Sequence, residues 1–489
     1  MKKQIKKINR TVKKLLTSQS KNKMPLQNII RSESALVEIN LEEHFNPILL
    51  AEVEKAFRDN YQTRLIRIVQ AIILAKRDAY FETLDPNLTI ELKPDKSLLR
   101  IVLRGVPHEK LVKGKLIKIK ERQILCGIRD LLVSRQYPLN DKSHESLTQY
   151  IFHFVRSAEV LTRTDRERNE LGRVMIQGGH HIPRHEKIHH KRLGYGIGLL
   201  GLELITGSGP GSMEEPMKGA IRGYQMNCLE RKFIGITEDG IISGEPCNDY
   251  IDHLIVFPDI EKRLEAFIRM SRAGIIFPGG PGTFEEILTI LWIKTHPLNK
   301  FFRFPLYCCQ PQQSGNYFKN IFAFLHECFD IDFEREGYLR YFESETEDKT
   351  NPLLDPRRVS YEIEAEMRDC LTFNERRSRK IQRIFSPLWD WDVYFPSELQ
   401  HPLIISKELI EGLEFSRKMP MEKLFYSIRS LSSAIVECNV RNRNFIKEQG
   451  VFKLRGDKTM LKRLDELFQS FAEEKRMGGR EYQCPYQIL

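Results

Sequence analysis

The chain has 489 residues, of which 41% are hydrophobic and 29% are charged, and its formal net charge is +11. This length predicts two or three domains with ample cores, and the composition is ordinary for a globular protein. No apolar run approaches the roughly 20 residues that a membrane-spanning helix needs, so we expect no membrane span.

The positive charge is concentrated near the start of the chain. Residues 1–31 contain ten Lys or Arg and no Asp or Glu, which leaves the remainder nearly neutral. We expect residues 1–45 to form a basic, flexible arm, and a solvated tail is the favoured interpretation. Binding to nucleic acid or to an anionic membrane surface, and an organellar transit peptide, are the alternatives.

Residues 46–165 predict an α+β domain. Apolar residues recur at helical spacing in residues 51–79 and again in 116–132, whereas residues 88–103 alternate as strands do. The highly charged stretch 162–170 marks the expected connection to the next domain.

Residues 166–370 alternate strand and helix patterns, which predicts a Rossmann-like, doubly wound parallel sheet. Ligands of such sheets bind at the carboxyl ends of the strands. Residues 371–489 predict a mainly helical domain without a catalytic motif. The expected strands are 173–177, 203–206, 233–237, 253–257, 274–277 and 304–307, and the expected helices are 187–200, 214–229, 259–272, 282–295, 317–328, 421–437 and 458–475.

Three glycine-bearing turns follow expected strands of this sheet. They are Gly178-Gly179, residues 207–211 and residues 279–282. Because parallel strands end at one edge of their sheet, these turns are expected to border one common site. Taken alone, the turn at 207–211 is weak evidence, since a tight turn that packs a helix against the sheet explains it equally well.

The third turn belongs to the sequence PGGPGTFEE at residues 278–286, between an expected strand and an expected helix. Strand, glycine turn and helix start present backbone N–H groups and the helix dipole to a phosphate. Glu286, one turn into the helix, is an unusual addition because a phosphate gains nothing from a negative charge there. We infer chemistry on a group attached to the phosphate; a carboxylate that complements the helix dipole is the alternative.

Residues 278–286 resemble the PGGxGTxxE motif of the Lonely Guy nucleotide phosphoribohydrolases, which are often mislabelled lysine decarboxylases. That family also has an essential arginine 15 positions before the proline of the motif, and Arg263 stands at that position. Without this spacing Arg263 would be taken for a surface salt-bridge residue. All fixed positions of the motif are present: Pro278, Gly279, Gly280, Gly282, Thr283 and Glu286.

Longer stretches are similar to the bacterial pyrimidine/purine nucleotide 5′-monophosphate nucleosidases. Those enzymes flank the catalytic domain with N- and C-terminal extensions, which assigns residues 46–165 to regulation or assembly. The similarity is weakest in the first 45 residues and around residues 386–402. The similar stretches lie at residues 178–180, 209–220, 258–267 and 452–458.

The resemblance implies hydrolysis of the N-glycosidic bond of purine and pyrimidine nucleoside 5′-monophosphates to free base and ribose 5-phosphate, without a cofactor. Glu286 would orient water and stabilise oxocarbenium-like charge, and Arg263 would orient the substrate or assist departure of the base. Gly279, Gly280, Gly282 and Thr283 would hold the 5′-phosphate. The nucleotide pocket would be lined by Gly178, Gly179, His180, Gly209, Gly211, Met213 and Glu214.

Some of these side chains have a second interpretation. Glu214 lines the pocket or is an ordinary acid at a helix start. His181, His185 and His189 have the spacing of helical zinc ligands, but Pro183 interrupts the pattern and no HExxH motif is present, so we expect no metal. Glu285 is expected to point about 100° away from Glu286 and to be solvated or paired.

The resemblance further implies a homo-oligomer, expected to be a homotetramer, with a guanosine alarmone such as ppGpp as effector. Nine cysteines without a CxxC pair fit buried thiols in the cytoplasm. Neither a membrane nor nucleic acid is expected as a main partner, and a non-catalytic nucleotide-sensing regulator of the same fold is the alternative function. The candidate pyrophosphate contacts are Arg64, Arg67, Arg77, Arg100, Arg104, Lys110, Lys113 and Lys115, for which solvated surface charge is the alternative.

Overall fold

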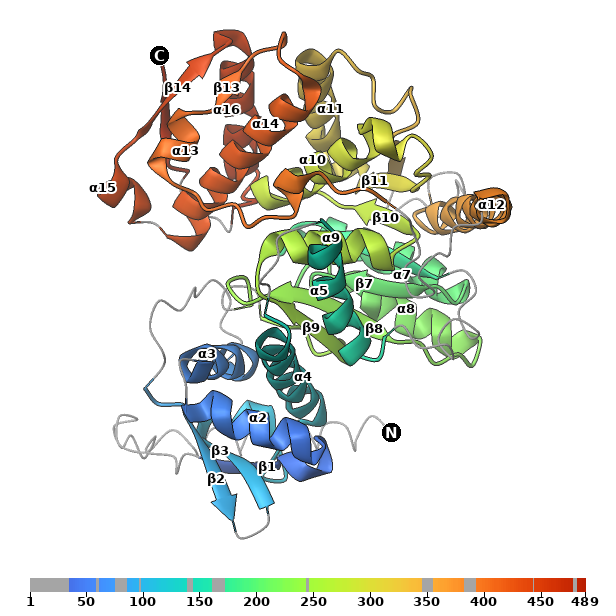
Figure 1. Cartoon of the computed structure of the whole chain (residues 1–489). Coiled ribbons are helices and arrows are strands. Elements are labelled where there is room, and N and C mark those ends of the chain that lie inside the picture. Colours follow the sequence, from blue (N-terminus) through green and yellow to red (C-terminus); the bar gives the residue numbers. More distant parts are fainter. Residues whose placement is uncertain are drawn as a thin grey trace, which may run out of the picture.

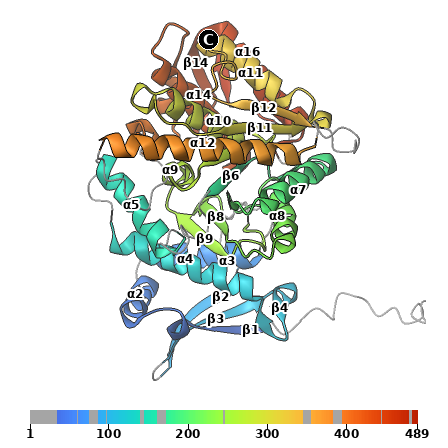
Figure 2. The same cartoon turned by 90° about the vertical axis from the view of Figure 1, so that its right-hand side faces the viewer.

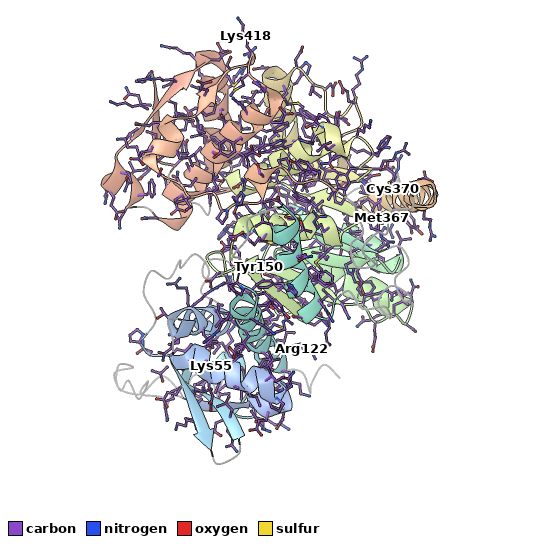
Figure 3. The ribbon with its side chains drawn as sticks, in the orientation of Figure 1. Lys55, Arg122, Tyr150, Met367, Cys370 and Lys418 are labelled. Atoms are coloured by element: carbon purple, nitrogen blue, oxygen red, sulfur yellow. The ribbon has the colours of Figure 1, made fainter. Side chains whose placement is uncertain are left out.

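The computed structural model describes residues 35–58, 61–74, 86–95, 98–138, 144–160, 172–242, 246–344, 355–381, 393–442, 444–477 and 482–489. The basic residues 1–31 of the predicted arm therefore lie outside the described residues. Three regions are stacked along one axis, with the N-terminal region at one end and the C-terminal region at the other (Figure 1). Lys55 and Arg122 mark the first region and Lys418 the last in Figure 3.

The N-terminal region is an antiparallel three-stranded sheet of order β1-β3-β2, covered by helices. The strand β1 corrects the predicted arm, which was expected to run to residue 45, because Val37 and Ile39 are buried and β1 pairs with β3. The predicted helix 51–79 is two helices, α2 and α3. The elements are β1 (Ala35–Asn40), α2 (Pro47–Arg58), α3 (Tyr61–Leu74), β2 (Thr89–Asp95), β3 (Leu98–Val106), β4 (Leu111–Val112), β5 (Lys115–Leu116) and α4 (Lys118–Gln136). The next helix, α5 (His144–Ser157), was predicted to belong to this region but packs on the central region instead, where the rings of Phe154 and Phe257 are 5.1 Å apart (Figure 1).

The central region is a parallel sheet of seven strands in the order β12-β11-β10-β6-β7-β8-β9, which confirms the predicted doubly wound α/β class. The chain winds outward from β6 in one direction and from β10 in the other, so the topological switch point lies between them. The strands are β6 (Arg173–Gln177), β7 (Glu203–Thr206), β8 (Phe233–Glu238), β9 (His253–Phe257), β10 (Ala273–Ile276), β11 (Leu306–Pro311) and β12 (Arg340–Ser344).

Alternate residues of the central strands enter two separate cores. Ile205 and Ile276 belong to one, whereas Leu204 and Ile275 belong to the other. Strands buried on both faces read as continuous apolar runs, which is why most of them were predictable. The edge strand β12 was not predicted, because its sequence RYFES is only partly buried and has no continuous apolar run.

Five helices connect these strands and cover both faces of the sheet (Figures 1 and 2). The helices α7 and α8 pack at very short range: a Cβ on Gly194 would lie 2.1 Å from the carbonyl oxygen of Pro216. This close packing fixes the loops that precede both helices. The bounds are α7 (Arg184–Leu199), α8 (Glu215–Met226), α9 (Ile260–Met270), α10 (Pro281–Thr295) and α11 (Tyr317–Phe329).

The helix α4 covers the open edge of the sheet at β9. Arg129 donates to the carbonyl oxygen of Leu254 at 2.7 Å, and Asp130 accepts from the N–H of Val256 at 2.8 Å. These side chains replace the missing neighbouring strand, which protects an otherwise exposed edge. A second link joins Arg64 of α3 to Asp239, directly after β8, at 2.6 Å.

The C-terminal region combines helices with a small parallel sheet of order β13-β14-β15, in addition to the helices that were predicted. The predicted boundary at 370/371 falls inside α12, which lies beside α7 (Figure 2). Met367 and Cys370 are buried on this helix (Figure 3). The elements are α12 (Arg357–Ile381), α13 (Lys407–Glu411), β13 (Glu414–Phe415), α14 (Met421–Val436), α15 (Phe445–Gln449), β14 (Phe452–Gly456), α16 (Lys458–Glu473) and β15 (Tyr486–Ile488).

The structure also bears on the cysteines and on the question of a membrane span. All nine cysteines are free thiols in the structure, and seven of them are buried. In the ranges that the structure describes, no helix combines the length and the apolar character of a bilayer span.

Candidate active site

The three predicted glycine turns meet at the carboxyl edge of the central sheet. The N–H of Gly179, after β6, donates to the carbonyl oxygen of Pro278, after β10, at 3.1 Å. The N–H of Ser212, in the turn after β7, donates to the carbonyl oxygen of Gly179 at 2.9 Å. The turns therefore form one hydrogen-bonded unit at the switch point, where doubly wound sheets bind their ligands.

The turn after β10 opens onto the start of α10. Gly280 is the N-cap and Pro281 the first helical residue, so the N–H groups of Gly282 and Thr283 have no acceptor within the helix. A Cβ on Gly279 would lie 2.1 Å from Thr283 Oγ1, whereas one on Gly282 would meet no atom within 4 Å. Gly279 thus allows the threonine hydroxyl to fold under the turn, and the side of Gly282 where a side chain would stand faces open space.

Glu286 and Arg263 lie together beside this turn. Arg263 Nη2 is 4.0 Å from Glu286 Oε1, and their side chains are only 5% and 12% exposed. The N-cap Asp259 accepts from the N–H of Lys262 and starts α9, which places Arg263 in its first turn. Arg263 Nε donates to the carbonyl oxygen of Ile236 at 3.1 Å, so the guanidinium is anchored on β8.

The turn after β7 is shaped to receive the arginine. A Cβ on Gly207 would lie 2.6 Å from Arg263 Nη2 and 2.7 Å from Met213 Sδ. Gly211 adopts φ +70 and lies against the carbonyl oxygen of His180, where a Cβ would approach to 2.4 Å. The predicted pocket residues of the first two turns are thus neighbours of one another and of Arg263.

Glu214 has an ordinary partner. Its carboxylate pairs with Lys218 Nζ at 2.9 Å, and the same ammonium lies 2.8 Å from Glu215. This pairing at the start of α8 favours the helix-start interpretation over a pocket-lining role. Glu285, which was expected to be either solvated or paired, is paired with Arg429 at 3.1 Å.

Sequence reasoning missed Asn248, which holds the second glycine turn. Its Nδ2 donates to the carbonyl oxygens of Ser208 and Gly209, each at 2.9 Å. Ser208 adopts φ 65, a left-handed conformation that an ordinary residue keeps only when its surroundings impose it. An asparagine in the loop before an edge strand belongs to no motif, so no sequence signal pointed to it.

The C-terminal region reaches the same turns through Arg476. This buried guanidinium makes a bidentate contact with Glu186 at the start of α7, at 2.9 and 3.4 Å. Its own carbonyl oxygen lies 2.7 Å from where a Cβ of Gly280 would stand. Ser314 donates to the same glutamate at 2.7 Å. The backbone of Arg476 therefore packs against Gly280, in the glycine turn after β10, although the two residues are almost 200 positions apart along the chain.

Two adjacent histidines lie buried behind that turn. His190 stacks on Phe277 with ring centroids 3.7 Å apart, and His189 meets the same ring edge-on at 5.8 Å. Burial lowers the pKa of His189 to about 3 and lowers that of His190 well below its ordinary value. Across the described ranges, no group of three or more His, Cys, Asp or Glu is arranged to hold a metal ion.

This burial predicts a loss of stability in acid. Unfolded histidine has a pKa near 6.5, so below that pH the unfolded chain binds protons that the native state rejects. The free energy of unfolding should fall as the pH drops from about 6.5 toward 3, by up to about 1.4 kcal/mol per pH unit and histidine. Urea unfolding at pH 7.5 and 5.5 measures this difference, which His190→Phe should reduce.

The matched control is His44→Gln, since His44 is exposed. It should leave the difference between the two pH values unchanged. An equal acid sensitivity in wild type and His190→Phe would contradict the assignment.

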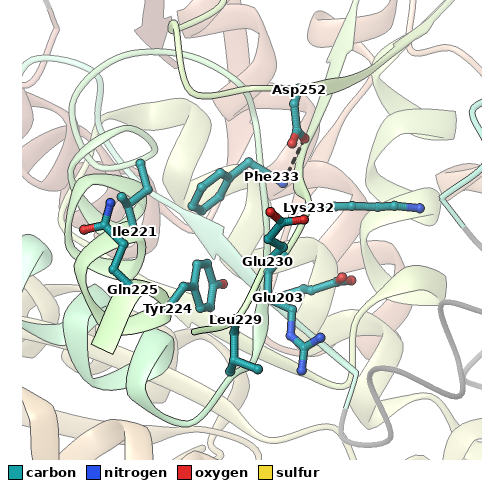
Figure 4. A pocket seen from close by; sticks show the side chains of 10 residues that line it. Glu203, Ile221, Tyr224, Gln225, Leu229, Glu230, Lys232, Phe233 and Asp252 are labelled. Carbon is teal, nitrogen blue, oxygen red and sulfur yellow. Dashed lines mark hydrogen bonds between the residues drawn. The ribbon is translucent and has the colours of Figure 1, made fainter. Parts of the chain in front are cut away.

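The cavity drawn in Figure 4 is separate from this site. It has a volume of about 440 Å³ and lies at the amino ends of β7 and β8, next to Glu203 and Phe233. The N–H of Phe233 donates there to Asp252 at 2.9 Å (Figure 4). Because it occupies the opposite edge of the sheet, it takes no part in the candidate site.

The fold and the site together define a Rossmann-like, doubly wound α/β protein with its candidate active site at the topological switch point. Two family models match the chain. One, described as "Possible lysine decarboxylase", matches residues 213–351. The other, described as "Pyrimidine/purine nucleotide monophosphate nucleosidase, C-terminal", matches residues 374–489.

Curated relatives extend this similarity over most of the chain. Proteins named pyrimidine/purine nucleotide 5′-monophosphate nucleosidase from Escherichia coli strains K12, O6:H1 and O157:H7 are each 32% identical over 421 residues. The match covers 83% of this chain and 87% of each relative. The chain belongs to the pyrimidine/purine nucleotide 5′-monophosphate nucleosidase family, as the resemblance in its motifs predicted.

Proposed function

We propose that this protein hydrolyses the N-glycosidic bond of purine and pyrimidine nucleoside 5′-monophosphates. The C1′–N bond breaks, water supplies the hydroxyl at C1′, and its proton ends on the departing base. The products are a free base and ribose 5-phosphate. The observation that supports this most is Glu286, 4.0 Å from Arg263 and one turn beyond the N–H groups of Gly282 and Thr283 at the start of α10.

The proposed roles follow from these positions. The N–H groups of Gly282 and Thr283, with the dipole of α10, bind the 5′-phosphate. Glu286 is one helical turn, about 5.4 Å, further along, where it holds the ribose hydroxyls, orients water and stabilises the oxocarbenium-like charge. Arg263 is a fixed multi-donor cation that orients the substrate and favours departure of the base.

A product assay tests the proposal. Purified protein is incubated with GMP, AMP, CMP, UMP and IMP, and base and ribose 5-phosphate are quantified by chromatography with mass detection. Equimolar release of both products is expected from at least one nucleotide. The matching nucleosides, which lack the phosphate, should be poor substrates because they cannot use the donors at α10. No release from any nucleotide by folded protein would refute the proposal.

The predicted assembly and effector belong to the same proposal. We propose a homotetramer in the cytoplasm and binding of (p)ppGpp to the N-terminal region. Among the candidate contacts, Arg64 is paired with Asp239 and Arg100 with Glu38, while Arg77 lies outside the described residues. Equilibrium binding of labelled ppGpp to the full chain, with light scattering for the mass, tests both points.

A further inference from the structure

A buried arginine of the C-terminal region bridges two helices of the central region. Arg429, on α14, has a side chain that is only 1% exposed. Its Nη2 lies 2.8 Å from Glu261 Oε1 and 3.1 Å from Glu285 Oε1. Both carboxylates are also buried, at 1% and 5% exposure. One guanidinium therefore holds two carboxylates in a site from which water is largely excluded.

Each of the two carboxylates lies close in sequence to one of the proposed catalytic residues. Glu261 lies on α9 two residues before Arg263, and Glu285 lies on α10 directly before Glu286. Arg263 is anchored on β8 by its Nε, and Glu286 is part of the first turns of α10. The distance between these two side chains consequently depends on how α9 and α10 are held relative to each other, and Arg429 contacts both helices.

Other contacts align α14 with α10 along its length. Ser432 donates to the carbonyl oxygen of Pro281, at the first residue of α10, at 2.9 Å. Near the other end, Phe425 stacks on Trp292 with ring centroids 6.2 Å apart and planes only 4° from parallel. The guanidinium of Arg429 thus sits on a helix that is itself fixed along α10.

We propose that Arg429 is a positioning residue that sets the separation of Arg263 and Glu286, so that the C-terminal region completes the active site without touching the substrate. The inference rests on the function proposed above. A buried arginine with two carboxylates is a costly way to gain stability, since apolar side chains of similar volume often stabilise as well. A role in fixing the separation of Arg263 and Glu286 explains why a buried arginine stands here rather than an apolar side chain.

The test compares variants at Arg429 with a matched buried arginine. Arg173 pairs with Glu203 at 3.0 Å and donates to the carbonyl oxygen of Val160, at the opposite edge of the sheet. For Arg429→Met we expect kcat for base release to fall about 100-fold, because a small misplacement of reacting groups has an effect of this size, while KM stays within about threefold of the wild-type value. Arg173→Met should keep kcat per folded molecule. Arg429→Lys should recover part of kcat.

A neutral triple variant separates positioning from stability. Arg429→Met combined with Glu261→Gln and Glu285→Gln removes the buried charges together, so its unfolding midpoint should return toward that of the wild type while kcat stays low. Recovery of kcat with stability would overturn the proposal, and so would an unchanged kcat in Arg429→Met. Low kcat in Arg173→Met per folded molecule would also count against it.

The proposed function is judged separately, by base release in the wild type. If the wild type releases no base, the crystal structure of Arg429→Met still decides the inference. An unchanged separation of Arg263 and Glu286 would overturn it, and an increased separation with altered placement of α9 against α10 would support it.

Discussion

Glu286→Gln is expected to lower kcat for base release on the order of 10³-fold, as loss of a group that stabilises transition-state charge does. Glutamine keeps the shape and the hydrogen-bonding oxygen, but it lacks the negative charge that opposes the oxocarbenium-like sugar. The helix-start donors of α10 remain, so binding of ribose 5-phosphate should change little. Steady-state kinetics with the preferred nucleotide and calorimetric binding of ribose 5-phosphate measure the two effects.

The control for this variant is Glu364→Gln on α12. Glu364 is a similarly half-buried carboxylate, 22% exposed, and pairs with Arg368 within its own helix. It is remote from the glycine turns in sequence and should leave kcat unchanged. Wild-type turnover by Glu286→Gln would contradict the catalytic role and favour a carboxylate that merely complements the helix dipole.

The sequence predicted those parts of the site that rest on local patterns. The strands that carry the site, their glycine turns and the start of α10 follow from short apolar runs and turn residues, whereas the edge strand β12 does not. That Arg263 and Glu286 come together depended on a family motif and its spacing, and the 4.0 Å separation confirms that they are neighbours. Their chemical roles remain proposals.

The parts that escaped prediction depend on contacts between distant segments. Asn248, Arg429 and Arg476 each bind groups more than 30 positions away along the chain, and none lies in a recognisable pattern. Buried arginines look like surface arginines in a sequence, because only the tertiary structure shows the carboxylates that pair with them. The C-terminal region was therefore predicted as a helical extension, although two of its arginines contact the elements that form the site.

Arg476→Met is expected to lower the free energy of unfolding by about 3–5 kcal/mol, because it leaves the buried carboxylate of Glu186 without its cation. Glu186 is fully buried, and only the hydroxyl of Ser314 would still donate to it among the contacts seen here. Urea unfolding followed by circular dichroism measures the loss. The control is Arg463→Met on α16, whose side chain is 55% exposed and forms ion pairs with Glu327 and Glu466 at the surface; it should cost less than about 1 kcal/mol.

The double variant Arg476→Met with Glu186→Gln distinguishes a buried charge from lost packing. A neutral glutamine still accepts from Ser314 and no longer needs a cation, so most of the stability should return. The methionine keeps the backbone of residue 476, whose carbonyl oxygen packs against Gly280. If the double variant is as unstable as Arg476→Met, packing rather than charge explains the loss. If it recovers stability, the loss in Arg476→Met comes from the unpaired carboxylate of Glu186, so the packing of the C-terminal region against the turn after β10 requires that this buried charge be neutralised.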